Sequence, residues 1–234
     1  MLPSAPNAKP SGNVLNITAQ PRDIFYSGRE YAQWLAVPVT IDSANTRCPS
    51  NQPYVWQIVA GTLLGKITAT KKYGASIIGP ITAYTSGTTL STDVYTATEV
   101  VRRFGASGTF ILNGPVVSGG PMAPVVVTYS SVSLTTGAIT ITALGTAYAA
   151  GAVIQPQDGS QNIITAVSDI YGVKVEDPTN TTNLDAFDPG LPTGGGMINT
   201  SLIVSYGTEP SVQAWIKSSL KAACGNGLTF NDDF

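Results

Sequence analysis

The chain has 234 residues, of which 11% are charged and 43% are hydrophobic, and its formal net charge is -2. An ordinary soluble domain has roughly 25% charged residues, so the polar part of this chain must be largely uncharged. This balance argues against a basic nucleic-acid-binding face, against a polybasic membrane contact and against disorder. A surface so poor in charge would be poorly soluble unless another protein covered much of it.

Histidine does not occur in the sequence, and this removes several kinds of chemistry at once. Ser-His-Asp and Cys-His catalysis, histidine metal ligation and the commonest general base all require it. Cys48 and Cys224 are too few and too far apart for a zinc site or a CxxC redox pair. We favour two unpaired buried thiols over one disulfide, and we expect no metal, no cofactor and no enzymatic activity.

The start of the chain and its longest apolar runs bear on localisation. Met1–Pro10 lacks the basic and then apolar order of a signal peptide. No segment approaches the ~18 consecutive apolar residues of a membrane span. We therefore expect a cytosolic origin and no membrane contact.

Residues 1–25 form a proline-spaced segment that predicts an extended N-terminal arm without a core of its own. The next pattern, Trp34–Ile41, alternates like a strand, and Pro38 favours an edge position. Tyr54–Tyr73 supplies the longest apolar and β-branched stretch, and its glycines indicate bends or bulges. We expect this stretch to lie in the core.

The middle of the chain holds the clearest local signal. Val125–Ser130 and Ile139–Ala143 each alternate apolar residues with small polar ones, and Thr135–Gly137 lies between them. This pattern predicts a β-hairpin with one apolar face and one threonine-rich face. Before it, Val94–Phe104 gives a weak helical signal and carries Arg102-Arg103, for which we expect a solvated pair or a contact with an acidic partner.

The last third predicts a short helix over Ile163–Asp169, a strand over Tyr171–Val175, a loop over Thr179–Gly196 and a strand over Ile198–Tyr206. Pro210–Ala223 is the strongest helix, because proline starts it, lysines lie near its end and glycine follows it. Its predicted apolar stripe consists of Val212, Trp215, Ile216, Leu220 and Ala223.

Together these elements predict a mainly β fold with a few short helices (α+β). We expect a sandwich-like or barrel-like core with an extended N-terminal arm and an inserted β-hairpin domain. The predicted parts are the arm at 1–25, a β-rich core at 26–80 and 150–234 with its helix at 210–223, and an inserted β-rich subdomain at 81–149.

Each candidate catalytic motif departs from its pattern. Gly61–Ile67 is one residue too short for a phosphate-binding loop and has Ile67 where serine or threonine would hold magnesium. Paired carboxylates could hydrolyse glycosides without histidine, so a glycosidase stays open as a rival, although nothing aligns the candidates. These candidates are Asp158, Asp169, Asp185 and Asp188.

Two segments carry a family resemblance. Gly61–Leu64 followed by Gly65–Tyr73 resembles the G-x-L-L-G-K-I-T-A-T-x-K-Y stretch of head decoration (cement) proteins of tailed bacteriophages, the broad lambda-type family. Ile154–Ser160 followed by Tyr171–Val175 is similar to a second block in longer phage and prophage members. Residues 80–150 and the tail after 176 are longer than a minimal decoration protein needs.

The resemblance implies a homotrimer at the three-fold sites of the outer capsid surface, made in the host cytoplasm. It would bind the major capsid protein after expansion and stabilise the head. The alternative is a trimeric tail, spike or fibre module that binds a host receptor, since such modules are also β-rich and poor in charge.

The resemblance also suggests which residues make these contacts. We expect the arm to contact the capsid, with Pro10, Arg22 and Tyr26 as its candidate residues. Part of Tyr54–Tyr73 is expected to pack near the trimer axis. The residues expected in this trimer or core segment are Leu64, Lys66, Ile67 and Tyr73.

Overall fold

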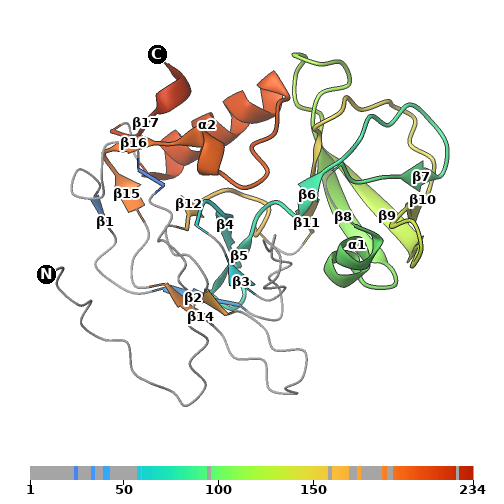
Figure 1. The fold of residues 1–234 in the computed structure, drawn as a ribbon, viewed down its shortest axis with the longest axis horizontal. Coiled ribbons are helices and arrows are strands. Elements are labelled where there is room, and N and C mark those ends of the chain that lie inside the picture. The colour runs from blue at the N-terminus through green and yellow to red at the C-terminus, as the bar shows by residue number, and fades with distance from the viewer. Residues whose placement is uncertain are drawn as a thin grey trace, which may run out of the picture.

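The computed structural model describes residues 24–25, 33–34, 39–42, 57–58, 60–93, 96–157, 160–168, 173–174, 186–188, 192–224 and 227–233. Over these residues the fold is mainly β with few helices, and its sheets curl, as the sequence predicts. Two bodies lie side by side and meet at β6 (Gly79–Pro80) and β11 (Val153–Pro156) (Figure 1).

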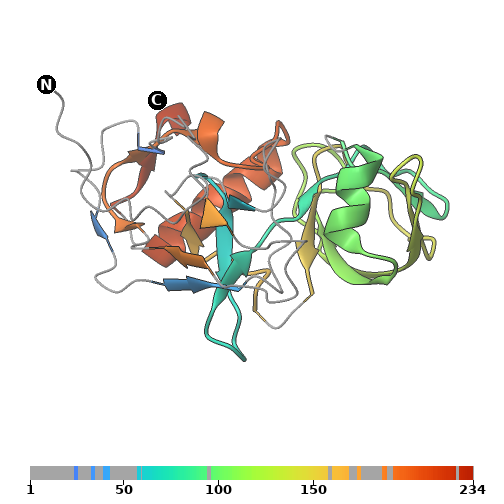
Figure 2. The same cartoon turned by 60° about the horizontal axis from the view of Figure 1, so that its bottom comes forward.

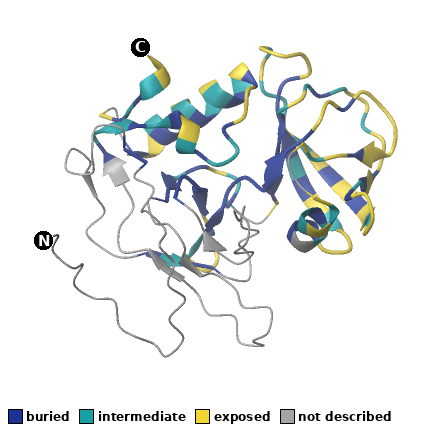
Figure 3. Ribbon diagram, in the orientation of Figure 1, coloured by how far each residue is buried: buried dark blue, intermediate teal, exposed yellow. Residues whose placement is uncertain are grey.

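The first body, here called the barrel, is one six-stranded sheet with the order β6-β11-β8-β9-β10-β7. The sheet curls until its two edges meet. Ile81, just after β6, forms a β-bridge with Thr92, just after β7, and this bridge joins the edges. Along β9, and along β8 up to Leu112, buried residues alternate with more exposed ones (Figure 3), so one face of each strand fills the barrel. The remaining strands are β7 (Thr89–Leu90), β8 (Gly108–Asn113), β9 (Val125–Val132) and β10 (Ile139–Ile141).

The predicted hairpin is confirmed within this sheet. β9 and β10 pair antiparallel, and Tyr129 lies opposite Ile141. Gly137 in the connection has φ 70°, a left-handed conformation that glycine adopts without strain. Val127, Tyr129 and Ile139 are buried, whereas the intervening threonines and serines are exposed.

The helix α1 (Ala97–Phe104) confirms the weak helical signal, although it begins three residues later than predicted. Thr96 caps its N-terminus, since its hydroxyl accepts a hydrogen bond from the Glu99 N–H. The helix lies across the barrel (Figure 2), and Val100 and Phe104 join the barrel core. The Tyr129 hydroxyl donates to the carbonyl of Phe104 and holds the end of the helix on the sheet.

Arg103 lies inside the protein, so the expectation of a solvated Arg102-Arg103 pair is wrong for this residue. Arg103 is 1% exposed. Its guanidinium pairs with Glu99 one turn earlier at 2.7 Å and donates to the carbonyl of Ile78 at 2.8 Å. A buried guanidinium requires such partners, because an unpaired charge in the interior is very costly. The helical spacing of Glu99 and Arg103 brings the two side chains together.

The second body, here called the α2 body, contains a five-stranded sheet with the order β12-β4-β5-β2-β14 and the helix α2 (Pro210–Cys224). Three two-stranded pairs, β1 with β15, β3 with β13 and β16 with β17, complete its strands within the described residues. The five strands of the sheet are β2 (Val39–Ile41), β4 (Leu63–Lys66), β5 (Tyr73–Ala75), β12 (Ala166–Val167) and β14 (Ala186–Asp188). The strands of the pairs are β1 (Gln33–Trp34), β3 (Gln57–Ile58), β13 (Val173–Lys174), β15 (Pro192–Gly194), β16 (Met197–Ile198) and β17 (Thr229–Phe230).

The C-terminal helix is confirmed, with one change in its apolar stripe. Val212, Ile216 and Leu220 are buried against the sheet, and Trp215 is half-buried beside them. Ala223 is exposed, and Cys224 takes the last inward position. Burial raises the pKa of the Cys224 thiol to about 11, so this thiol stays protonated at neutral pH. Cys48 lies outside the described residues.

β11 contributes side chains to the apolar cores of both bodies. Val153 belongs to the apolar cluster under α2, whereas its neighbour Ile154 belongs to the barrel core. Successive residues of a strand point to opposite faces, so one short strand serves both cores. The barrel cluster runs from Ile78 to Ile154 in sequence. The division into 81–149 and the flanking parts stays a prediction.

Several sequence predictions in the α2 body are wrong. Instead of a helix over 163–169, Ala166–Val167 forms β12, because its backbone pairs with Leu63 and Leu64 of β4. The predicted strand at 198–206 is short: β16 ends at Ile198, and a 3-10 helix at Thr200–Leu202 follows. The predicted loop at 179–196 contains β14 and β15.

Of the predicted strand at 34–41, the described residues are Trp34 in β1 and Val39–Ile41 in β2, which belong to different sheets. β2 is an inner strand, since it pairs with both β14 and β5. Pro38 lies outside the described residues. Pairing with strands that are distant in sequence decides these elements, and local patterns do not report it.

A charged cluster fixes the last residues of the described chain to α2. The Lys217 ammonium lies 2.8 Å from carboxylate oxygens of both Asp232 and Asp233. The Tyr206 hydroxyl donates to Asp232 at 2.8 Å. The hydrogen bond from Lys217 lowers the pKa of Asp233. Burial alone would raise the pKa of Asp232, but hydrogen bonds from Lys217 and Tyr206 lower it on balance.

This cluster predicts an acid-sensitive contribution to stability. Because both carboxyl pKa values are depressed, the contribution is present above about pH 4 and is lost as the pH falls through the lowered values. We expect Lys217→Met to lower the free energy of unfolding by up to about 1 kcal/mol at pH 7, and by less at pH 3. Urea unfolding at the two pH values measures both differences. An equal loss at pH 7 and pH 3 would contradict the ionic origin.

Candidate functional site

The predicted capsid-contacting residues Pro10, Arg22 and Tyr26 lie outside the described residues. The nearest described part is Ile24 and Phe25, and both are buried in the apolar cluster of the α2 body. Phe25 also bridges Ile198 of β16. The end of the predicted arm is therefore anchored on the α2 body at this point.

The predicted trimer or core segment divides into inward and outward residues. Leu64 and Ile67 are at most 2% exposed and lie in the core. Lys66 is exposed and lies opposite the half-buried Tyr73 across β4 and β5, with its ammonium 5.8 Å from the centre of the ring. Of the four residues, only Lys66 and Tyr73 can offer an outer surface to a partner.

The glycines of the same segment are sites of close backbone approach. A Cβ on Gly65 would lie 1.9 Å from the carbonyl oxygen of Gln161, and one on Gly61 would lie 1.9 Å from that of Leu202. The Gly61 N–H also donates to the carbonyl oxygen of Ser168, and Gly61 has φ 89°. These glycines, which belong to the segment that resembles the decoration proteins, thus allow residues 61–65 to pack directly against the backbone of two other segments of the α2 body.

The loop 114–123 of the barrel presents a pair of apolar side chains to solvent. Val116 is 40% exposed and Val117 is 70% exposed. The Gly120 N–H donates to the Val117 carbonyl, and Pro115 bridges Met122 across the base of the loop. This surface was not predicted from the sequence, although two valines between proline and a glycine pair are an unusual composition for a solvated turn.

Glu209 braces this loop from the α2 body. It is 4% exposed and precedes α2. Its carboxylate accepts hydrogen bonds from the N–H of Gly119 at 2.8 Å and of Ser211 at 3.3 Å. The Ser211 hydroxyl donates in turn to the carbonyl of Gly120. Burial would raise the pKa of Glu209, but these backbone hydrogen bonds lower it, so the carboxylate is charged at neutral pH and holds the loop in place.

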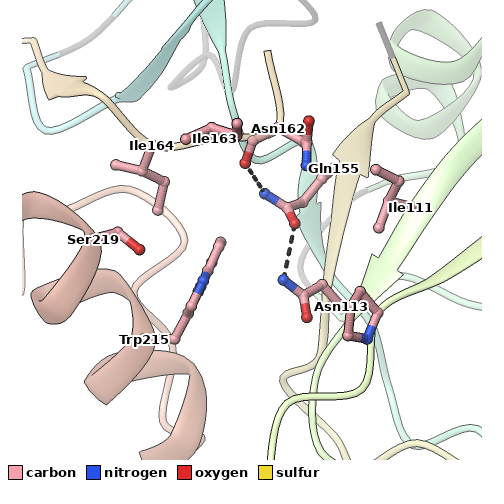
Figure 4. Close-up of a pocket in the computed structure, with 9 residues that line it drawn as sticks. Ile111, Asn113, Gln155, Asn162, Ile163, Ile164, Trp215 and Ser219 are labelled. Carbon is pink, nitrogen blue, oxygen red and sulfur yellow. Dashed lines mark hydrogen bonds between the residues drawn. The ribbon is translucent and has the colours of Figure 1, made fainter. Parts of the chain in front are cut away.

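A pocket of about 210 Å³ lies where the barrel meets the α2 body. β8 and β11 provide one wall, and α2 and the segment 162–164 provide the other (Figure 4). No single stretch of sequence signals this site, because its residues come from separate segments. It is lined by Ile111, Asn113, Pro124, Gln155, Asn162, Ile163, Ile164, Trp215 and Ser219.

Neither metal ligands nor membrane spans stand out in the described part of the chain. There, no three histidine, cysteine, aspartate or glutamate residues are grouped so that they could hold a metal ion. No helix among the described residues is long and apolar enough to cross a membrane. The rival carboxylates Asp158, Asp169 and Asp185 lie outside these residues, and so does the side chain of Asp188.

In comparisons with known proteins, no protein-family model, no curated protein and no solved structure matches the chain.

Proposed function

We propose that this chain is a virion structural protein that decorates the outer surface of an expanded capsid, as a homotrimer bound to the major capsid protein. The observation that carries the proposal is the braced loop 114–123, which holds Val116 and Val117 in solvent. A fixed loop loses little conformational freedom on binding, so burying its apolar side chains adds directly to affinity. Burial stabilises a complex by roughly 25 cal/mol per Å² of apolar surface.

The low charge of the chain supports the same role. Many copies that each bridge several capsid subunits would stabilise a shell by multivalent binding, without any chemistry. Within such a lattice the neighbours cover much of the surface, so few charges have to be desolvated. The resemblance of Gly61–Tyr73 to cement proteins points to the same class of assembly.

Binding to expanded heads that lack this protein tests the proposal. We expect deletion of residues 1–20 to leave a soluble trimer that no longer occupies the heads, because the arm would add backbone hydrogen bonds to a neighbouring subunit. We expect Val116→Asn/Val117→Asn to weaken binding at least tenfold. Leu134→Asn is the matched control, since Leu134 is 78% exposed on a separate turn.

Unchanged occupancy after both changes would overturn the proposal. Copy number per virion, measured by quantitative mass spectrometry, separates it from the tail or fibre alternative. A decoration protein is present at a number close to that of the major capsid protein. A tail component is present at a far lower number.

A further inference from the structure

The pocket between the barrel and the α2 body contains a buried hydrogen-bond acceptor without a partner. Asn113 is 7% exposed, and its Oδ1 accepts no hydrogen bond within the described chain. Most buried polar atoms in proteins are paired, and leaving one unpaired costs about 1–3 kcal/mol. Asn113 lines the pocket, but its Oδ1 has almost no accessible surface, so a ligand there would supply the missing donor only after a slight shift of the Asn113 side chain.

The neighbouring hydrogen bonds fix which atom of Asn113 is left over. The Gln155 Nε2 donates to the carbonyls of Asn162 at 2.6 Å and Ser76 at 3.1 Å, so its Oε1 must face Asn113. The Asn113 Nδ2 donates to that Oε1 at 3.0 Å. Turning the Asn113 amide over would place two oxygens against each other. The network therefore holds Oδ1 as an acceptor, and the site calls for an N–H or O–H donor.

The opposite wall is aromatic and apolar. In Figure 4 the Trp215 indole projects from α2 toward the Asn113–Gln155 pair, and a slot lies between them. Ile163 is 56% exposed at this site, and Ile164 lies beside it. None of the lining residues is charged, and Asn162 and Ser219 add further neutral polar groups. The lining thus favours an uncharged ligand with an apolar face and several hydroxyl or amide groups.

The volume of the pocket limits the ligand to about one ring. A cavity of about 150 Å³ holds benzene, and drug-sized ligands occupy about 300–1,000 Å³. The pocket lies between these at about 210 Å³.

We propose that this pocket binds an N-acetylated sugar residue. The acetamido N–H donates to Asn113 Oδ1, its methyl group contacts the isoleucines, and the C–H face of the sugar ring packs on the Trp215 indole. An acetamido sugar combines all three features in one ring-sized, uncharged molecule. The proposal stands on the pocket alone and does not depend on capsid binding.

Titration with N-acetylglucosamine, followed by the side-chain amide and indole N–H signals in ¹H–¹⁵N NMR spectra, tests the proposal. We expect saturable shifts of the Asn113 and Trp215 signals with a Kd of order 1 mM. Glucose, which has a hydroxyl in place of the acetamido group, should bind at least tenfold more weakly. It has no methyl group to cover the isoleucines and no amide N–H to donate to Asn113 Oδ1. N-acetylalanine methylamide is the probe for a peptide ligand.

Two helix variants separate binding from folding. Ser219→Leu fills the slot from a half-buried position and should abolish the shifts without loss of structure. Ser218→Leu, at the neighbouring exposed position, is the matched control and should bind like the unchanged chain. Equal binding of glucose, tighter binding of the peptide probe, no shifts at about 50 mM sugar, or unaltered shifts in Ser219→Leu would each overturn the proposal.

Discussion

Replacing Gly65 with alanine is expected to lower the free energy of unfolding by about 3 kcal/mol. The new Cβ would lie 1.9 Å from the Gln161 carbonyl oxygen and 2.8 Å from that of Ile163. Both neighbours are backbone atoms, so no side-chain rotation relieves the contact. β4 and the segment 161–163 would have to separate, and the hydrogen bond from the Thr165 N–H to the Leu64 carbonyl would be strained with them.

Gly145→Ala is the matched control for this prediction. A methyl group on Gly145 would have no heavy atom within 4 Å, and the φ of this residue is not in the left-handed range. A chain of this size loses roughly 2–4 °C in Tm per kcal/mol, so Gly65→Ala should melt roughly 6–12 °C lower while Gly145→Ala stays near the unchanged protein. Similar melting of the two variants would contradict the close approach of β4.

Arg103→Met is expected to cost about 3 kcal/mol of stability, because it removes the cation from a buried pair. Methionine can fill much of the space, but the Glu99 carboxylate and the Ile78 carbonyl each lose a charged donor. Glu99 is 14% exposed, so water restores only part of the lost interaction. The effect should appear as a lower urea midpoint with an unchanged slope.

A double-mutant cycle with Glu99→Gln isolates the pair itself. If the ion pair carries the effect, the double variant should be destabilised by less than the sum of the two single variants. Lys71→Met, at an exposed position, controls for loss of one positive charge and should change stability by less than about 0.5 kcal/mol. An Arg103→Met variant as stable as this control would contradict a structural role for the buried guanidinium.

Elements with strong local signals were predictable from sequence. The alternation of β9 and β10, with glycine in the connecting turn, depends on residues near one another in the chain. The same is true of α2, where proline starts the helix and a 3.6-residue period sets its buried side. The mainly β class follows from such patterns together with the frequency of threonine, glycine and proline.

Elements that depend on distant partners were not predictable. Residues 163–169 are predicted as a short helix, yet Ala166 and Val167 form a strand because β4 offers an open edge about 100 residues earlier. From the sequence, Arg103 is interpreted as half of a solvated basic pair, but in the folded barrel it is buried. The pocket likewise requires Asn113, Gln155 and Trp215 to meet from three separate segments.

The sequence by itself determined the class of fold, its best hairpin and helix, and the scarcity of charge. Only the tertiary structure decided which residues of Gly61–Tyr73 face outward. It also decided that Val116 and Val117 are exposed and that the buried Asn113 Oδ1 has no donor. The physical reason is the range of the interactions. Turn and helix preferences act over a few residues, whereas burial, close backbone approach and hydrogen-bond satisfaction depend on every segment that packs around a site.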